Sequence, residues 1–509
     1  MSLPPDPVSV DPGSLKEALY RLSEPLSLDR PVRAFVPACR PESLGDGAFL
    51  RAHGLRYAYA AGAMANGIAS VELVEAMSRA GMLGFFGAAG LSPAAVESAI
   101  VRLRQSLGDS PHGFNLIHSP NEPDLEEAVA GLYLRRGVRL VEASAYLDLT
   151  LPLVRYRLSG IHRGPDGAVV APNRVIAKVS RVEVASKFLA PAPEAMLREL
   201  VGRGDLTREQ AALSEAVPVA EDLTAEADSG GHTDNRPLVT LLPTMLALRD
   251  RLQERHRYAR APRVGAAGGI ATPAAAAAAY MMGAAYVLTG SVNQACVESG
   301  SSEAVRKLLA EAGQADTAMA PAADMFEMGV KVQILKRGTM FAMRAGKLYE
   351  LYRAYEGLEA IPPAQRALLE RDLFRAPLET IWSQTREYFL DRDPSQVERA
   401  EREPKHKMAL VFRWYLGQAS RWANAGEPSR RVDYQVWCGP AMGAFNEWAK
   451  GSFLEEPKER RVETVALNIL FGAAALTRLS VLRCQGFPVD PSWAQVAPRP
   501  LEELKRALN

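Results

Sequence analysis

The chain has 509 residues, of which 48% are hydrophobic and 23% charged, so it can bury a sizeable core and is not disordered throughout. Its 60 Lys and Arg balance 59 Asp and Glu, so the net charge of +1 does not indicate nucleic acid or an anionic membrane as a partner. The four cysteines lie far apart without zinc-finger spacing, and we expect neither a disulfide framework nor a metal site.

The first part of the chain, residues 1–54, is interpreted as an amino-terminal extension. Its start, MSLPPDPVSVDPGSL, is rich in proline and lacks the basic and then apolar stretches of a secretory signal. Separated cysteines also suit a reducing compartment. We therefore expect a cytoplasmic protein.

Strand-like segments alternate with helix-length segments from residue 55 to about 310. The eight strand-like segments are 57–67, 82–90, 113–120, 138–146, 174–181, 218–232, 263–272 and 285–294. Such alternation favours a parallel sheet, and eight units of this size match a (β/α)8 TIM barrel over residues 55–320. A doubly wound open sheet competes, but it usually has fewer strands in this span. Residues 182–216 are predicted to be a helical insertion after the fifth strand.

Past residue 310 the alternation stops, and residues 321–509 are predicted to be a helical subdomain that covers the barrel mouth. All six tryptophans lie there. The apolar stretch ALNILFGAAALTRLSVL is shorter than a bilayer span and contains Arg478, while residues 265–288 are mainly alanine and glycine around a Thr-Pro. We therefore expect no membrane partner.

Glycines follow the seventh and eighth predicted strands, where parallel barrels often hold phosphate. Gly268 and Gly269 expose backbone N–H groups before a helix that starts at Pro273, and Gly290 and Ser291 follow the last strand. A helix amino terminus behind paired glycines favours anions. Ordinary turns are the alternative. The spacing does not match the G-x-G-x-x-G fingerprint of dinucleotide-binding folds.

Polar side chains end successive predicted strands and can surround a planar heterocycle. Met64 and its small neighbours end the first strand, Asn115 the third, Glu142 the fourth and Lys178 the fifth. A lysine near the N1–C2=O edge of a flavin would stabilise the reduced anion, which is the tuning that a flavoenzyme needs. The alternative for Lys178 is an ion pair with Glu142 inside the barrel.

Several strings along residues 55–350 carry a resemblance to a known family: AGAMANGIAS, GMLGFFGAAGL, GFNLIHSPNEP, EADSGGHTDNRP, GGIATP and LTGSVNQACVESG. Together they resemble the PfaD-type trans-acting enoyl reductases of polyketide and polyunsaturated fatty acid synthases. These are related to FabK-type enoyl reductases and nitronate monooxygenases. The resemblance implies a barrel that binds FMN and uses NADPH to reduce an enoyl thioester on an acyl carrier protein.

The resemblance also assigns the site residues. His232 is the acid–base candidate: once hydride reaches the β-carbon of the thioester, the α-carbon needs a proton, which imidazole supplies near neutral pH. Asp228 and Asp234 flank it in the sequence, and either could orient it, although surface turn chemistry explains both equally well. A structural role is the alternative for His232. The cofactor-binding residues would be Gly62, Ala63, Met64, Asn115, Glu142, Lys178, Asp228, Gly230, Gly231, Gly268, Gly269, Ile270, Thr289, Gly290 and Ser291.

Two other functions remain open from the sequence: a flavin oxidase of the nitronate monooxygenase type, and a flavin-free scaffold that only docks carrier proteins. The basic runs at 405–407, 430–431 and 458–461 are candidates for contacting an acidic carrier protein, with solvated helix faces as the alternative. A homodimer is compatible with the sequence. Neither the thioester nor the carrier protein is specified by the residues.

Overall fold

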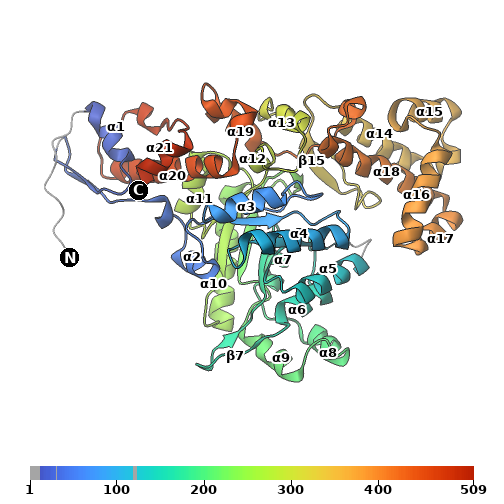
Figure 1. Ribbon diagram of the computed structural model, residues 1–509, viewed down its shortest axis with the longest axis horizontal. Helices are drawn as coiled ribbons and strands as arrows, with labels where there is room; N and C mark the ends of the chain where they lie inside the picture. The colour runs from blue at the N-terminus through green and yellow to red at the C-terminus, as the bar shows by residue number, and fades with distance from the viewer. Residues whose placement is uncertain (1–11, 30, 119–122, 509) are drawn as a thin grey trace. The chain divides into compact units, whose positions relative to one another are not determined.

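The computed structural model describes residues 12–29, 31–118 and 123–508 (Figure 1). The chain forms two compact units, one of Met1–Asp228, Asp234–Gly300 and Ala444–Asn509, the other of Ser229–Thr233 and Ser301–Gly443. These limits differ from the predicted divisions at residues 54 and 320, which stay predictions. Residues 1–11, which include most of the proline-rich start, lie outside the described ranges.

Eight parallel strands close into a barrel in the first unit, which confirms the predicted α/β fold class. Their order around the barrel is β10-β12-β13-β3-β4-β5-β6-β9. The strands are β3 (Tyr59–Ala61), β4 (Leu83–Phe86), β5 (Gly113–Ile117), β6 (Leu140–Ser144), β9 (Arg174–Val179), β10 (Asp222–Glu226), β12 (Arg263–Ala267) and β13 (Val287–Thr289). They are shorter than the predicted segments, which ran on into the loops at the strand ends.

A helix follows each strand, and polar residues before several helices explain where they begin. Ser70, Ser92, Thr150 and Thr272 each accept a hydrogen bond from the backbone N–H three residues later. These helices are α3 (Val71–Arg79), α4 (Pro93–Leu107), α5 (Pro123–Arg136), α6 (Leu151–Leu158), α7 (Val182–Phe188), α10 (Leu238–His256), α11 (Pro273–Met281) and α12 (Ser291–Gln294). Two further helices, α8 (Glu194–Gly202) and α9 (Arg208–Leu213), lie in the predicted insertion.

The barrel interior is filled by aromatic side chains at its amino-terminal end. Phe49, from helix α2 (Gly47–His53), stacks on Tyr286 with ring centroids 4.2 Å apart. A side chain at Gly265 would lie 2.4 Å from the Tyr286 ring, so the glycine in β12 leaves the space that this ring fills. The interior is therefore a packed core and not a pore.

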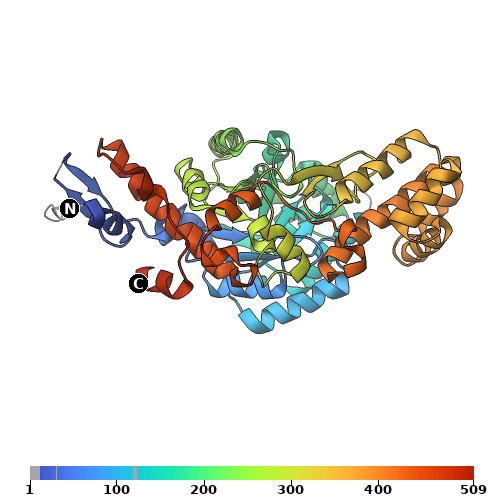
Figure 2. The same ribbon diagram turned by 90° about the horizontal axis from the view of Figure 1, so that it is seen from above.

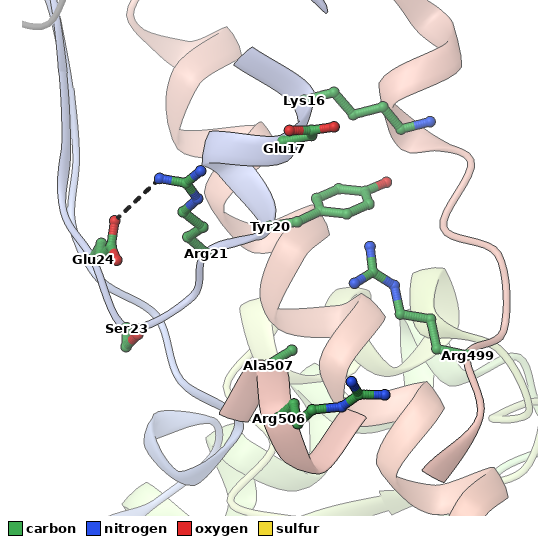
Figure 3. Close-up of a pocket in the computed structure, with 9 residues that line it drawn as sticks. All are labelled: Lys16, Glu17, Tyr20, Arg21, Ser23, Glu24, Arg499, Arg506 and Ala507. Atoms are coloured by element: carbon green, nitrogen blue, oxygen red, sulfur yellow. Dashed lines mark ion pairs between the residues drawn. The ribbon is translucent and has the colours of Figure 1, made fainter. Parts of the chain in front are cut away.

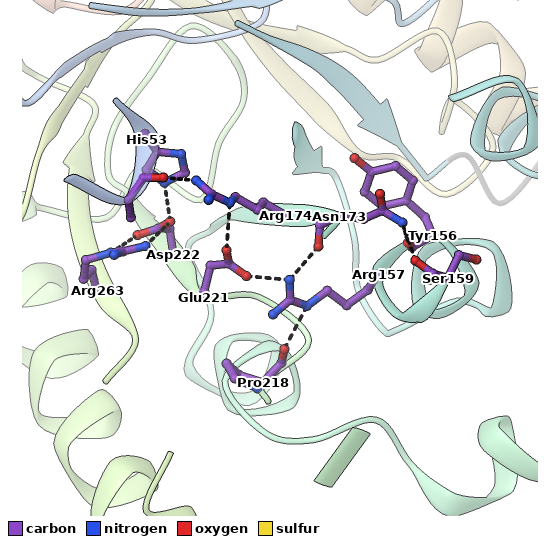
Figure 4. Close-up of polar contacts among 11 residues, drawn as sticks. His53, Tyr156, Arg157, Ser159, Asn173, Arg174, Pro218, Glu221, Asp222 and Arg263 are labelled. Carbon is purple, nitrogen blue, oxygen red and sulfur yellow. Dashed lines mark hydrogen bonds and ion pairs between the residues drawn. The ribbon is translucent and has the colours of Figure 1, made fainter. Parts of the chain in front are cut away.

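A buried ionic cluster closes the same end of the barrel (Figure 4). Asp222, at the start of β10, accepts two hydrogen bonds from the Arg263 guanidinium at 2.6 and 2.8 Å, and its Oδ2 lies 2.8 Å from His53 Nε2. Arg157 lies 2.5 Å from Glu221 and donates to the carbonyl oxygen of Asn173. The amino-terminal end of a parallel barrel is opposite its active-site end, so these groups serve stability.

Replacing Asp222 with asparagine is expected to lower the free energy of unfolding by about 3–5 kcal/mol, because it leaves Arg263 buried without its counter-ion. Burial alone would raise the pKa of Asp222, but His53 and Arg263 hold it below its usual value. Asp222 therefore stabilises the fold at neutral pH, and this contribution is lost as the pH falls through its lowered pKa.

Urea unfolding at pH 7 and at acid pH measures both effects. The control is Asp250→Asn, which removes an exposed ion pair with Arg249 and should cost at most about 1 kcal/mol. Equal losses in the two variants would show that the Asp222 cluster contributes no more than a surface pair.

The first and last described elements of the chain pack together within the first unit (Figure 2). Helix α1 (Pro12–Tyr20) and the antiparallel pair β1 (Leu26–Leu28) and β2 (Ala34–Val36) share a core with the last third of α20 (Val462–Cys484). The chain ends with α19 (Ala441–Ala449), α20 and α21 (Leu501–Leu508). The described part of the predicted extension is thus anchored from α1 to β2.

Helix α20 is longer than the sequence analysis allowed, and by length and composition it is the one described helix that could cross a membrane. Of its most apolar window, 78% is buried inside the fold. Gly472 in this helix packs on the start of α11, since a side chain there would lie 2.6 Å from Pro273. The apolar composition of α20 is accounted for by burial against the barrel.

The second unit combines a small antiparallel sheet with helices. Its strands β11 (Gly231–His232), β15 (Lys331–Leu335) and β14 (Thr317–Pro321) lie in that order. Its helices are α13 (Glu303–Ala310), α14 (Phe341–Ala354), α15 (Pro363–Leu368), α16 (Leu378–Arg392), α17 (Pro394–Arg402) and α18 (Pro404–Ala425). The helices confirm the predicted helical region, which also contains the short strand β15; β15 pairs with the preceding β14 and with β11, far back in the chain.

Candidate active site

Two glycine turns at the carboxyl ends of β12 and β13 leave backbone exposed. Gly268 and Gly269 have φ of +82° and +74°, which favour glycine. A side chain at Gly268 would lie 2.6 Å from the Ala227 backbone, so this position is fixed by packing, whereas at Gly269 and at Gly290 it would meet nothing within 4 Å. The space above Gly269 and Gly290 is therefore open to a ligand.

Helix α11 begins directly after the first of these turns, with the Thr272 hydroxyl accepting from the Ala275 N–H at 3.3 Å. Its free N–H groups and the open turns together make a site suited to phosphate. Of the neighbouring predicted residues, Ile270 and Thr289 are buried, and Ser291 begins α12.

Glu142, on β6, is the central polar group of the barrel mouth. Its carboxylate is fully buried, and Oε2 accepts a hydrogen bond of 3.0 Å from the Ala63 N–H. Oε1 has no hydrogen-bond partner among the described residues and would lie 3.4 Å from a side chain at Gly62. Burial raises the pKa of Glu142 to about 7 against the opposing charge of Lys178. A buried carboxyl oxygen without a partner indicates a missing polar ligand.

Lys178, on β9, pairs with a carboxylate that the sequence analysis did not consider. Its Nζ lies 3.1 Å from Glu226 Oε1, and both side chains are 16% exposed. Burial alone would lower the pKa of Lys178, but Glu226 and Glu142 raise it above its usual value. The suggested pairing with Glu142 is thus a longer-range attraction, and Lys178 keeps its positive charge in the mouth.

Asn115 is the third polar residue that was predicted at a strand end. Its Nδ2 donates to the Glu142 carbonyl oxygen at 3.2 Å and to Ser144 Oγ at 3.3 Å. Met64 is half-buried in the loop after β3. These contacts place an amide, a carboxyl group and an ammonium group on neighbouring strands. Together with the open glycine turns, this donor and acceptor set fits FMN: a phosphate at Gly269 and Gly290, and a polar heterocycle near Ala63, Glu142 and Lys178.

His232 belongs to the second unit, although the residues on either side of Ser229–Thr233 belong to the first. Gly231 and His232 pair with Gln333 and Val332 of β15. Gly231 has φ +83°, and a side chain at Gly230 would lie 2.9 Å from the Cys438 backbone. Both glycines are therefore required by the local backbone, whatever else they contact.

The imidazole of His232 has a carboxylate partner, Asp324. The distance from His232 Nε2 to Asp324 Oδ1 is 3.2 Å, and the side chains are 37% and 32% exposed. Burial alone would raise the pKa of Asp324, but the hydrogen bond and charge of His232 hold it below its usual value. An ionised carboxylate beside the ring orients it and stabilises its protonated form.

Asp324 was not among the carboxylates considered for orienting the imidazole, and that role for Asp228 or Asp234 stays a prediction. Asp234 accepts hydrogen bonds from Ser180 and Arg181, and Asp228 accepts one from Asn235 at 2.8 Å. No local signal identified Asp324, because it lies 92 residues from His232 in the chain.

The basic runs considered for carrier docking are largely used inside the fold. Lys405 donates to the Tyr355 carbonyl oxygen at 2.5 Å, and Lys407 lies 5.3 Å from the Trp382 ring centroid. Arg430 and Arg460 are buried and donate to backbone carbonyl oxygens. Arg431, Lys458 and Arg461 of the same runs are exposed, and Lys405 and Lys407 are partly exposed, so contact with a carrier protein stays a prediction for these runs.

A separate cavity of about 640 Å³ lies between the chain ends in the first unit (Figure 3). Its lining includes Lys16, Tyr20, Arg499 and Arg506, and Arg499 lies over the Tyr20 ring at 5.4 Å. None of the predicted site residues lines it. It is therefore distinct from the barrel mouth.

Comparison with known families and proteins extends this description. A family model described as nitronate monooxygenase matches residues 51–345. A second model, described as the inserted helical domain of [acyl-carrier-protein] S-malonyltransferase, matches residues 355–434.

Among curated proteins, a polyunsaturated fatty acid synthase subunit of Thraustochytrium sp. is 49% identical over 455 residues, covering 88% of this chain and 30% of its own length. Polyketide biosynthesis protein PksE of Bacillus subtilis is 46% identical over 456 residues, covering 89% of this chain and 59% of its own length. The chain thus spans less than two thirds of either relative.

Among solved structures, the enoyl reductase domain of MlnA from the macrolactin cluster of Bacillus amyloliquefaciens is 40% identical with a TM-score of 0.82, covering 86% of this chain and 99% of that one. FabK from Thermotoga maritima is 19% identical with a TM-score of 0.51, covering 86% of this chain and 98% of that one, which is a likeness of fold alone.

Proposed function

The chain belongs to the nitronate monooxygenase family and, within it, to the PfaD-type enoyl reductases, and on that premise we propose that it is an FMN-dependent enoyl reductase. It would take hydride from NADPH and reduce enoyl thioesters that an acyl carrier protein presents in polyketide or polyunsaturated fatty acid biosynthesis. None of the four cysteines, all of which lie in the described residues, forms a disulfide, which supports a cytoplasmic location as part of this proposal.

The observation that carries the proposal is the pair of open glycine turns above the barrel strands. Gly269 and Gly290 each leave room for a ligand at the strand ends, beside the start of α11. A flavin-free scaffold has no need for such a phosphate site. The unpartnered Glu142 Oε1 gives the same mouth a polar group that a bound heterocycle would satisfy.

When bound, FMN supplies a carrier of hydride between NADPH and the β-carbon of the thioester. The protein's own groups would hold and tune it. Ala63 positions the Glu142 carboxyl, and the Lys178 ammonium keeps a positive charge in the mouth. His232, oriented by Asp324, would donate the proton that the α-carbon needs.

A flavin oxidase of the nitronate type is the second candidate, because the family model that matches residues 51–345 carries that description. The two functions differ in the acceptor that reoxidises the flavin. An enoyl reductase passes electrons to the thioester without oxygen, whereas an oxidase needs oxygen.

Absorbance of the purified protein followed by anaerobic NADPH oxidation with a crotonyl thioester tests the proposal. We expect a flavin spectrum and turnover that depends on the thioester. A colourless protein that gains no colour with added FMN would support a flavin-free scaffold that only docks carrier proteins. Flavin that turns over only with a nitronate and oxygen would support the oxidase.

A further inference from the structure

An exposed face that carries methionines and basic residues begins where β15 ends and continues onto helix α14. Lys336, Arg337, Met340, Met343 and Lys347 form it, and are here called the methionine face. The last three follow at spacings of three and four, so they lie on one side of the helix. Met340 is 42% exposed and Met343 is 62% exposed.

A neighbouring loop widens the methionine face. The Met340 N–H donates to the Val432 carbonyl oxygen at 2.7 Å, which brings Arg431 and Val432 beside it, and Val432 is 39% exposed. Methionine is a flexible, polarisable side chain that adapts to different partners. Large apolar side chains gathered on an exposed surface mark an interaction site more often than single ones do.

The surface carries four basic side chains, two of which have acidic neighbours. Within the part of the chain that the structure describes, no carboxylate lies in ion-pair range of Lys336 or Arg431. Arg337 is 3.6 Å from Asp316 and 3.9 Å from Glu311, and Lys347 is 3.7 Å from Glu350, so Lys336 and Arg431 supply the cations without an ion pair. The face therefore offers cations to a partner, in contrast to the nearly neutral chain as a whole.

The exposed side chains stand on a well-packed support. The opposite side of α14 places Phe341, Ala345 and Leu348 in the core of the second unit, each fully buried. Arg344, on the same helix, pairs with the buried Asp433. Exposure of the methionines is thus not a result of a loosely held helix.

The methionine face is close along the backbone to the candidate catalytic histidine. Val332 of β15 pairs with His232, and Lys336 follows four residues later. At the rise of a β-strand these four residues span about 13 Å. A tethered thioester arm that enters from this face would need to cover only a short distance to His232.

We propose that the methionine face is the docking surface for the acyl carrier protein, with an acidic helix of the carrier meeting its cations and apolar side chains packing on Met340 and Met343. The inference rests on the proposed function. A second copy of this chain fits less well, because a symmetric contact would set cations against cations. The same unit matches the helical domain model of an acyl-carrier-protein transferase.

The test compares steady-state kinetics on crotonyl acyl carrier protein and on a crotonyl pantetheine thioester. Lys336→Glu/Lys347→Glu should raise KM for the carrier-bound substrate roughly tenfold and leave the small thioester unchanged, because surface charges act on encounter with the partner. Met343→Ser, which changes no charge, should also raise KM for the carrier-bound substrate and leave the small thioester unchanged. Lys450→Glu, at an exposed lysine of the first unit, is the matched control.

Three results would overturn the docking site: equal losses on both substrates, no loss on either, or the same loss in the Lys450 control. Circular dichroism of each variant confirms that the fold is retained. If the parent protein reduces neither substrate, the proposed function fails, and that outcome is distinct from a failure of docking.

Discussion

Purified Gly269→Asp protein is expected to be colourless and inactive as a reductase. The structure leaves open space at this position, so the new side chain would project to where the phosphate of the cofactor is proposed to bind. A carboxylate there repels a phosphate and displaces it from the N–H groups at the start of α11. Flavin content, measured from absorbance after release by heat, gives the direct readout.

Gly269→Asn is the matched control. Its side chain has the same shape and makes the same demand on the backbone, where φ is +74°, and Asn and Asp tolerate positive φ better than most residues. Asparagine should therefore retain a substantial part of the flavin, while aspartate retains almost none. Equal flavin content in the two variants would show that the cofactor phosphate does not bind at this turn.

His232→Ala is expected to separate flavin reduction from thioester reduction. Reduction by NADPH requires no proton at the α-carbon, so the variant should keep its flavin and be reduced at near the parent rate. Reoxidation by an enoyl thioester requires that proton, and a positioned general acid contributes roughly 10²–10⁴-fold. Stopped-flow absorbance should show the loss in the second half-reaction alone.

Asp324→Asn tests how the histidine is held. It keeps the geometry of the contact at 3.2 Å but removes the charge that favours the protonated ring. We expect a smaller loss in reoxidation than for His232→Ala, with the pH profile of that step moved to lower pH. If His232→Ala reoxidises at the parent rate, another group or solvent protonates the α-carbon and His232 is structural.

The barrel could be predicted because its signal is local and repeated. Eight apolar segments separated by helix-length segments predict parallel strands. Because the active site of such a barrel lies at the carboxyl ends of its strands, this pattern also locates the glycine turns at Gly268, Gly269 and Gly290. Lys178 and Glu142 were found in the same way. The Lys178–Glu226 pair could also have been predicted from the strand register. Lys178 is in register with Thr224, and Glu226 lies two residues further on the same side of β10.

The partners that join distant segments could not be predicted. Asp324 reaches His232 only because β11 pairs with β15, and neither two-residue β11 nor five-residue β15 has a pattern that specifies this pairing. The apolar stretch in α20 was judged shorter than a bilayer span, and it contains Arg478. The folded chain buries that arginine, whose Nη1 and Nη2 donate to the carbonyl oxygens of Arg21 and Glu24. Both depend on contacts made only after folding.

The mass of the acyl group on a carrier protein measures enoyl reduction by this chain directly. Crotonyl acyl carrier protein is incubated without oxygen with NADPH and the FMN-loaded chain, and the carrier is then measured by intact-protein mass spectrometry. We expect the acyl group to gain two hydrogens in proportion to the NADPH oxidised. An unchanged acyl mass, with flavin bound and NADPH present, would contradict enoyl reduction by this chain.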